Sequence, residues 1–175
     1  MSSYIESDSE QAANQFRSKI GLNDTKIHDA STILAKWKRV SPGCDYEVVP
    51  DDRMPGYEEA YWDGSNNRIV LSESTFVQAN SGQPRALMTV CHEIGHAVLR
   101  HKGKANRSLA FSQEEKIAPL VKRQESQAKR FAAALMAPFH MICDFNSVEE
   151  LSFQFRLSRE AAQYRFDELQ RYKRR

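Results

Sequence analysis

Hydrophobic positions recur at helical spacing in two long segments of the chain. In the segment 84–99 they form one stripe, which consists of Leu87, Val90, Cys91, Ile94 and Val98. Pro84 suits the first turn of this helix. The second stripe predicts a helix over 119–137, which Pro119 opens and Pro138 ends. Both helices are amphipathic, so each is expected to bury one face in a common core.

Weaker patterns fill the N-terminal part of the chain. Residues 1–8 are serine-rich and acidic, and we expect them to be disordered. A helix is predicted over 9–20, and a second one over 25–38 with Asp24 or Thr25 as its N-cap.

Short alternating segments predict a small sheet. Residues 46–49 form one strand, and 59–62 and 68–71 form a hairpin around a turn at 63–67. We expect an antiparallel sheet immediately before the helix 84–99. An exposed edge of this sheet can bind an extended peptide by strand addition. The alternative is that the sheet only covers the helix.

The C-terminal tail predicts two short helices, over 147–155 and 159–172. Their spacing resembles a helix-turn-helix, and the tail has a basic end that consists of Arg165, Arg171, Lys173, Arg174 and Arg175. DNA contact is possible but not favoured, because the tail has too many apolar residues for an independent DNA reader: Phe153, Phe155, Leu157, Tyr164, Phe166 and Leu169. We therefore expect a domain over 1–145 and a helix-turn-helix-like extension over 146–175, packed on the same domain.

Composition excludes several classes of protein. The net charge is +2, from 25 basic and 23 acidic side chains, so the chain as a whole has no electrostatic preference for nucleic acid. The three cysteines are odd in number and lack metal-knuckle spacing, which indicates free thiols in a reducing compartment. No apolar run approaches the roughly 20 residues of a membrane span, and the N-terminus is unlike a signal peptide. We expect a cytoplasmic protein.

The helix 84–99 contains the pattern His-Glu-x-x-His, formed by His92, Glu93 and His96. Residues four apart share a helix face, with their Cβ atoms about 6 Å apart, so both imidazoles can bind one Zn²⁺. Glu93 lies beside them and can act on water without being a ligand. The pattern therefore predicts a hydrolytic zinc site, with Glu93 as the catalytic residue.

A hydrolytic zinc site needs a third protein ligand. Glu125 lies at the edge of the stripe 119–137, near the small residues Ala128 and Ala132. These allow two helices to approach closely, and we prefer Glu125 to His140. His101 would lie off the metal face of a continuing helix, so we do not count it as a ligand.

Two blocks carry a resemblance to a known family. The block TVCHEIGHAVL (89–99), followed by ESQAKRFAAALMAP (125–138), resembles the ImmA/IrrE family of zinc metallopeptidases. The resemblance covers about residues 25–172. It implies an α+β fold, a helix-rich zincin-like domain with a small antiparallel sheet before the motif helix and a C-terminal helical pair. It also implies His92, His96 and Glu125 as zinc ligands.

The same resemblance implies a substrate, namely a helix-turn-helix transcriptional repressor encoded nearby, whose cleavage relieves repression in mobile-element or stress regulation. The competing hypothesis is a regulatory module that keeps the metal site and sequesters its partner without cleavage. One departure from the family is Lys129, which stands where Asn or Asp usually supports a ligand histidine. The oxyanion donor stays open among four residues: Tyr57, Tyr61, His101 and His140.

Overall fold

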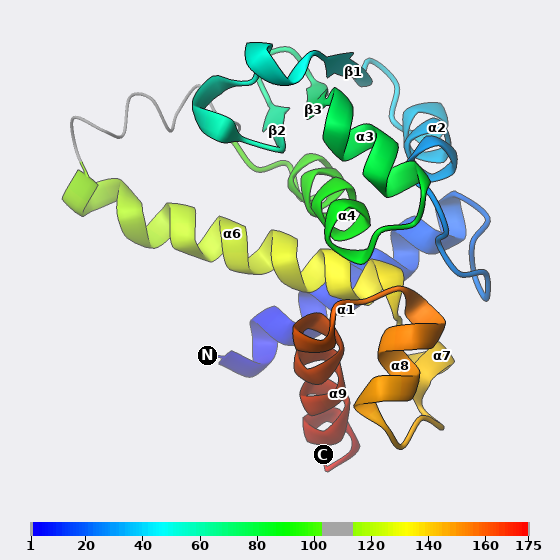
Figure 1. Cartoon of the computed structure of the whole chain (residues 1–175). Helices are drawn as coiled ribbons and strands as arrows, with labels where there is room; N and C mark the ends of the chain where they lie inside the picture. Colours follow the sequence, from blue (N-terminus) through cyan, green and yellow to red (C-terminus); the bar gives the residue numbers. More distant parts are fainter. Residues whose placement is uncertain (1, 103–113, 175) are drawn as a thin grey trace.

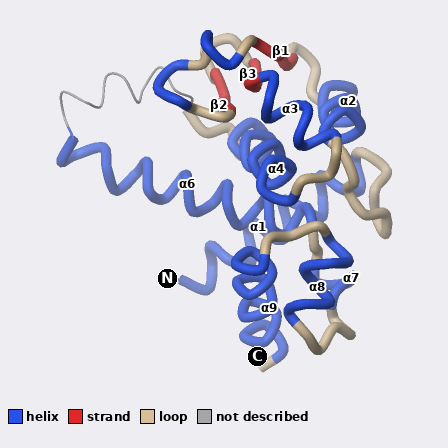
Figure 2. The backbone as a smooth tube through the Cα atoms, viewed as in Figure 1, coloured by secondary structure: helices blue, strands red, loops and turns tan. Residues whose placement is uncertain are grey.

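The computed structural model describes the backbone of residues 2–102 and 114–174. A small sheet lies at one end of the molecule, and helices occupy the rest (Figures 1 and 2). The longer helices are α1 (Ser2–Lys19), α2 (Ala30–Val40), α4 (Pro84–Val98), α6 (Glu114–Met136) and α9 (Arg159–Lys173). The shorter ones are α3 (Glu73–Asn80), α7 (Phe139–Ile142) and α8 (Val148–Phe155), and two 3-10 turns lie at Asp51–Arg53 and Pro55–Tyr57.

The sheet has three strands in the order β1-β3-β2, namely β1 (Asp45–Val49), β3 (Arg68–Ser72) and β2 (Ala60–Asp63). The hairpin prediction is confirmed, because β2 and β3 pair antiparallel with Trp62 opposite Ile69. β1 pairs parallel with β3, so the sheet is mixed, and the expectation of a wholly antiparallel sheet is wrong. The segment between β1 and β2 crosses over and leaves β3 in the centre.

The core forms where α6 packs against both α4 and α1 (Figure 1). Phe131 of α6 is fully buried, and its ring lies 6.0 Å from that of Phe16 on α1. α3 and α4 pack against the sheet, and Trp62 of β2 meets Trp37 of α2 edge to face at 6.3 Å. The apolar stripes of the two long amphipathic helices therefore meet in one core, as their spacing predicted.

The N-terminal helices differ from their predicted bounds. α1 begins at Ser2, seven residues before the predicted start, and no Gly or Pro interrupts a helix in this segment. α2 begins at Ala30, and its N-cap is Asp29, whose carboxylate accepts from Thr32 N at 2.7 Å. The expected caps at 24 and 25 are wrong because that segment is a turn, in which the Thr25 carbonyl accepts from buried Arg17.

One further helix boundary was wrong, and one helix was not predicted. The structure places Pro119 inside α6, which begins at Glu114. A proline close to the start of a helix removes one main-chain hydrogen bond, a loss that the packing of a long helix can offset. The segment before α4 contains the unpredicted helix α3, whose N-cap Ser72 accepts from Thr75 N at 3.2 Å. Residues 103–113 lie outside the described part of the chain.

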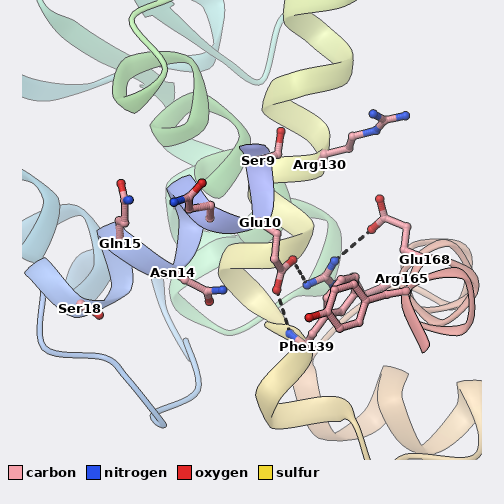
Figure 3. A pocket seen from close by; sticks show the side chains of 11 residues that line it. Ser9, Glu10, Asn14, Gln15, Ser18, Arg130, Phe139, Arg165 and Glu168 are labelled. Atoms are coloured by element: carbon pink, nitrogen blue, oxygen red, sulfur yellow. Dashed lines mark hydrogen bonds and ion pairs between the residues drawn. The ribbon is translucent and has the colours of Figure 1, made fainter. Parts of the chain in front are cut away.

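The tail joins the main body through a buried charge cluster (Figure 3). Arg165 of α9 is 2% exposed, pairs with Glu10 of α1 and with Glu168 at 3.1 Å, and donates to the carbonyl of Ala137. Its guanidinium also lies 3.9 Å from the ring centre of Phe139. These residues, with the exception of Ala137, line a cavity of about 610 Å³ between α1, α6 and α9. Arg165 is therefore used inside the fold and is not part of an exposed basic surface.

None of the helices in the described ranges combines the length and the apolar character that crossing a membrane would require.

Candidate metal centre

α4 brings the three functional side chains of its motif together. The ligand atoms of His92, Glu93 and His96 lie within 4.8 Å of one another. The two Nε2 atoms are 3.1 Å apart, and the rings meet edge to face with centroids 4.7 Å apart. His96 and Glu93 are buried, whereas the side chain of His92 is 22% exposed. The site is therefore open to solvent on the His92 side.

Glu125 of α6 faces both imidazoles. Its Oε2 atom lies 3.1 Å from His92 Nε2, and its Oε1 atom lies 3.4 Å from His96 Nε2. The alternative candidate, His140, lies elsewhere, with Nε2 3.0 Å from the carbonyl of Asn23 and 3.3 Å from the carboxylate of Asp24. The structure therefore brings together the histidine pair and Glu125, and leaves His140 out.

A glycine makes this approach of the two helices possible. A Cβ atom on Gly95 would lie 3.1 Å from the carbonyl oxygen of Ala128 and 3.0 Å from the Phe131 ring. A side chain at position 95 would therefore be tighter than an ordinary van der Waals contact, and its neighbours on α6 would have to shift. Ala128 is itself fully buried and small, so both helices contribute to the close contact.

The donor set fits a zinc ion. Donors at about 2.0–2.1 Å from a tetrahedral zinc ion stand roughly 3.3 Å from one another. The two imidazole Nε2 atoms are 3.1 Å apart, and each lies within 3.4 Å of one oxygen of Glu125, Oε2 for His92 and Oε1 for His96. Two neutral imidazoles and one carboxylate also match the His₂Glu set of hydrolytic zinc enzymes. The residues present therefore fit a zinc ion in both donor type and spacing.

His101 lies next to His96, contrary to the prediction that it belongs to a continuing helix. α4 ends at Val98, the chain reverses at Arg100, and His101 Nδ1 lies 2.9 Å from His96 Nδ1. The opposite nitrogen of His101, Nε2, lies 3.1 Å from Gln127 Oε1. Burial lowers the pKa of His101 to about 4, so this imidazole is neutral near neutral pH.

Lys129 is turned away from these histidines. Its ammonium lies 5.7 Å from the ring centre of Tyr164 on α9, within reach of a cation–π contact. The hydrogen-bond partner of His96 is therefore His101, at a position that the family block did not indicate.

The structure places the side chains of three oxyanion candidates: Tyr61, His101 and His140. The side chain of Tyr57 lies outside the described residues. Tyr61 alternates along β2 with Trp62, which faces the end of α4 through its bond to the His101 carbonyl, so Tyr61 lies on the opposite face of the sheet. His101 contacts His96 at Nδ1, which is the nitrogen remote from Glu125.

The sequence did not indicate the helix contact at Gly95 or the contacts of His101 with His96 and Gln127. A glycine inside an amphipathic helix is a signal for close packing, and this one could have been found. The turn at Arg100 could not have been predicted, because a helix end of this kind usually has glycine at this position.

The chain was compared with curated proteins and with models of protein families. No curated protein matches the chain at a significant level. The model of the M78 peptidases, described as an IrrE N-terminal-like domain, matches residues 47–167, which include the histidine pair, Glu93 and Glu125. The M78 peptidases are metallopeptidases, so this chain has a metallopeptidase type of site. The match spans most of the chain, which therefore belongs to the M78 peptidase family through an IrrE N-terminal-like domain.

Proposed function

We propose that this protein is a zinc-dependent endopeptidase that hydrolyses a peptide bond in a helix-turn-helix transcriptional repressor. The observation that carries the proposal is the convergence of His92, His96 and Glu125 from two helices at separations of 3.1–3.4 Å. This spacing suits one zinc ion, and Glu93 lies beside it within the same cluster.

In this proposal each residue has one role. His92, His96 and Glu125 hold the metal, which supplies a Lewis acid for the scissile carbonyl and makes water more acidic. Glu93 accepts the proton of the attacking water and delivers it to the nitrogen of the leaving amine. Glu93 suits this role because it is 8% exposed and lies in the same cluster as the two histidines.

The sheet supports an endopeptidase over an exopeptidase. β2 is an edge strand, and the bond from Trp62 Nε1 to the His101 carbonyl, 3.2 Å long, places it beside the end of α4. An extended peptide can add to such an edge through main-chain hydrogen bonds, which do not require a chain terminus. The repressor as the substrate follows from the family resemblance. Repressors of this class also act in the cytoplasm, where we place this protein.

The test is a cleavage assay with a purified helix-turn-helix repressor encoded beside this protein's gene, analysed by mass spectrometry. We expect fragments with zinc present, and none with a chelator or with Glu93→Gln, which keeps the three proposed ligands. The matched control is Glu73→Gln, an exposed glutamate on α3, which should cleave like the wild type.

The outcomes separate the two hypotheses for this site. An intact repressor held in a stable complex, with or without chelator, would contradict the peptidase and favour the sequestering module. A repressor that is neither bound nor cleaved would contradict the proposed substrate class. Normal cleavage by Glu93→Gln would refute the role of Glu93.

A further inference from the structure

The end of α4 places His101 against His96 by main-chain geometry. Arg100 adopts the left-handed conformation with φ of 54°. Its N–H donates to the Ala97 carbonyl at 3.2 Å, and the His101 N–H donates to the His96 carbonyl at 2.9 Å. This pair of bonds is a Schellman motif, which brings the second residue after the helix cap next to the third residue from the helix end. His101 and His96 occupy these two positions.

His101 is then held from three directions. Its carbonyl accepts from Trp62 Nε1 of β2 at 3.2 Å, and its side chain lies between His96 and Gln127. The His96 and His101 rings have centroids 5.0 Å apart, and His101 is 8% exposed. The imidazole of His101 therefore has a defined position between α4 and α6.

With the amide oxygen of Gln127 toward His101 and a neutral His101, the hydrogen bonds among Gln127, His101 and His96 run in one direction. The amide oxygen of Gln127 accepts, so His101 Nε2 carries the proton of the bond between them. A neutral imidazole then has a lone pair at Nδ1, which accepts from His96 Nδ1–H. His96 therefore has its free lone pair at Nε2, the nitrogen that faces His92 and Glu125.

We propose that His101 and Gln127 form a hydrogen-bond relay that holds His96 in the tautomer competent to bind the metal. This inference rests on the proposed function. The relay takes the place of the acidic or amide side chain that the family resemblance expects at position 129, since Lys129 faces Tyr164. α6 thereby contributes twice to the centre, with Glu125 directly and with Gln127 through His101. Both residues of the relay are positioning residues.

The first measurement is the zinc dissociation constant, from competition with a chelator of known affinity. Loss of the partner of a ligand histidine weakens metal binding by roughly 10- to 100-fold. We expect this loss for His101→Phe, and a smaller loss in the same direction for Gln127→Leu. Gln127→Glu keeps an acceptor and should bind zinc like the wild type. The matched control is His28→Phe, an exposed histidine outside the relay.

The second measurement is the tautomer of His101 in the zinc-loaded protein, from long-range ¹H–¹⁵N correlations. The relay requires a proton on Nε2 and none on Nδ1, a signature that a merely space-filling His101 would not show. This readout needs no variant, so it holds even if His101→Phe fails to fold.

Any of three results would overturn the relay. The first is wild-type zinc affinity in folded His101→Phe, and the second is equal zinc affinity in Gln127→Leu and Gln127→Glu. The third is a proton on His101 Nδ1. Failure of the proposed function gives a different result. If the wild type binds zinc and has its His101 proton on Nε2, but cleaves no repressor, only the proposed peptidase function is contradicted. A wild type that takes up no zinc contradicts both.

Discussion

Gly95 of α4 lies so close to Ala128 of α6 that an added Cβ atom would stand 3.1 Å from the Ala128 carbonyl oxygen. This contact lies one residue from His96, and Ala128 lies three residues from Glu125. The distance between the helices at this point therefore controls the distance between the proposed ligands. Main-chain atoms form most of the contact, so side-chain rotation cannot relieve it.

Gly95→Ala should therefore destabilise the protein and weaken zinc binding. Helix propensity alone favours Ala over Gly by about 1 kcal/mol, so stabilisation is the expectation without a clash. Overpacking costs about 1–3 kcal/mol, and we expect it to exceed the gain. Denaturant unfolding and chelator competition measure the two effects. If Gly95→Ala is more stable than the wild type and binds zinc equally well, the packing of α4 against α6 at Gly95 tolerates a Cβ atom.

Zinc should stabilise the folded chain, because the proposed ligands come together only when α4 and α6 pack. A ligand at 100 times its dissociation constant adds about 2.7 kcal/mol. We expect a rise in melting temperature that a chelator reverses, and a strongly reduced rise in Glu125→Ala. His28→Ala, at an exposed site, should respond like the wild type. A full response in Glu125→Ala would remove Glu125 from the ligand set.

Arg100→Gly should leave the metal centre intact and increase the free energy of unfolding by up to about 1 kcal/mol. The reason is the positive φ of Arg100, a conformation that costs a non-glycine residue about 1 kcal/mol or more. Arg100→Val, whose branched side chain tolerates this conformation poorly, should lose both stability and zinc affinity. If Arg100→Val retains the wild-type values, the turn is not what positions His101.

Arg165→Met should cost about 3–5 kcal/mol in the free energy of unfolding, because it leaves the carboxylates of Glu10 and Glu168 without their shared cation. The matched control is Arg159→Met, which breaks the pair of Arg159 with Glu149, whose side chains are 82% and 69% exposed. Such a surface pair contributes about 1 kcal/mol or less. Equal losses in the two variants would contradict a structural role of the buried cluster.

The three thiols should react with iodoacetamide at very different rates. Burial raises the pKa of the Cys91 thiol to about 12, and its side chain is fully buried in α4. Cys143 is exposed and should react first, followed by partly exposed Cys44. Peptide mapping by mass spectrometry gives the order. Modification of Cys91 in the folded protein would mean that α4 is not packed as the structure shows.

The long amphipathic helices could be predicted because their signal is local. The stripe from Leu87 to Val98 and the pair of His92 and His96 follow from a period of 3.6 residues, and the structure has α4 at Pro84–Val98. The hairpin was predicted for the same reason, since its turn residues lie between its strands. The parallel pairing of β1 was not predicted, because it joins strands that a crossover separates in the sequence.

The amino-acid sequence by itself determined that one helix would present two histidines and a glutamate, and it indicated the family of the chain. Only the tertiary structure decided which carboxylate faces His92 and His96, because α4 and α6 come together through packing at Gly95 and Ala128. The tertiary structure also decided the position of His101. The turn at Arg100 has no glycine, so the hydrophobic pattern of the sequence does not predict it. Spacing along a helix is a local property of the chain, whereas contacts between helices depend on how their surfaces fit.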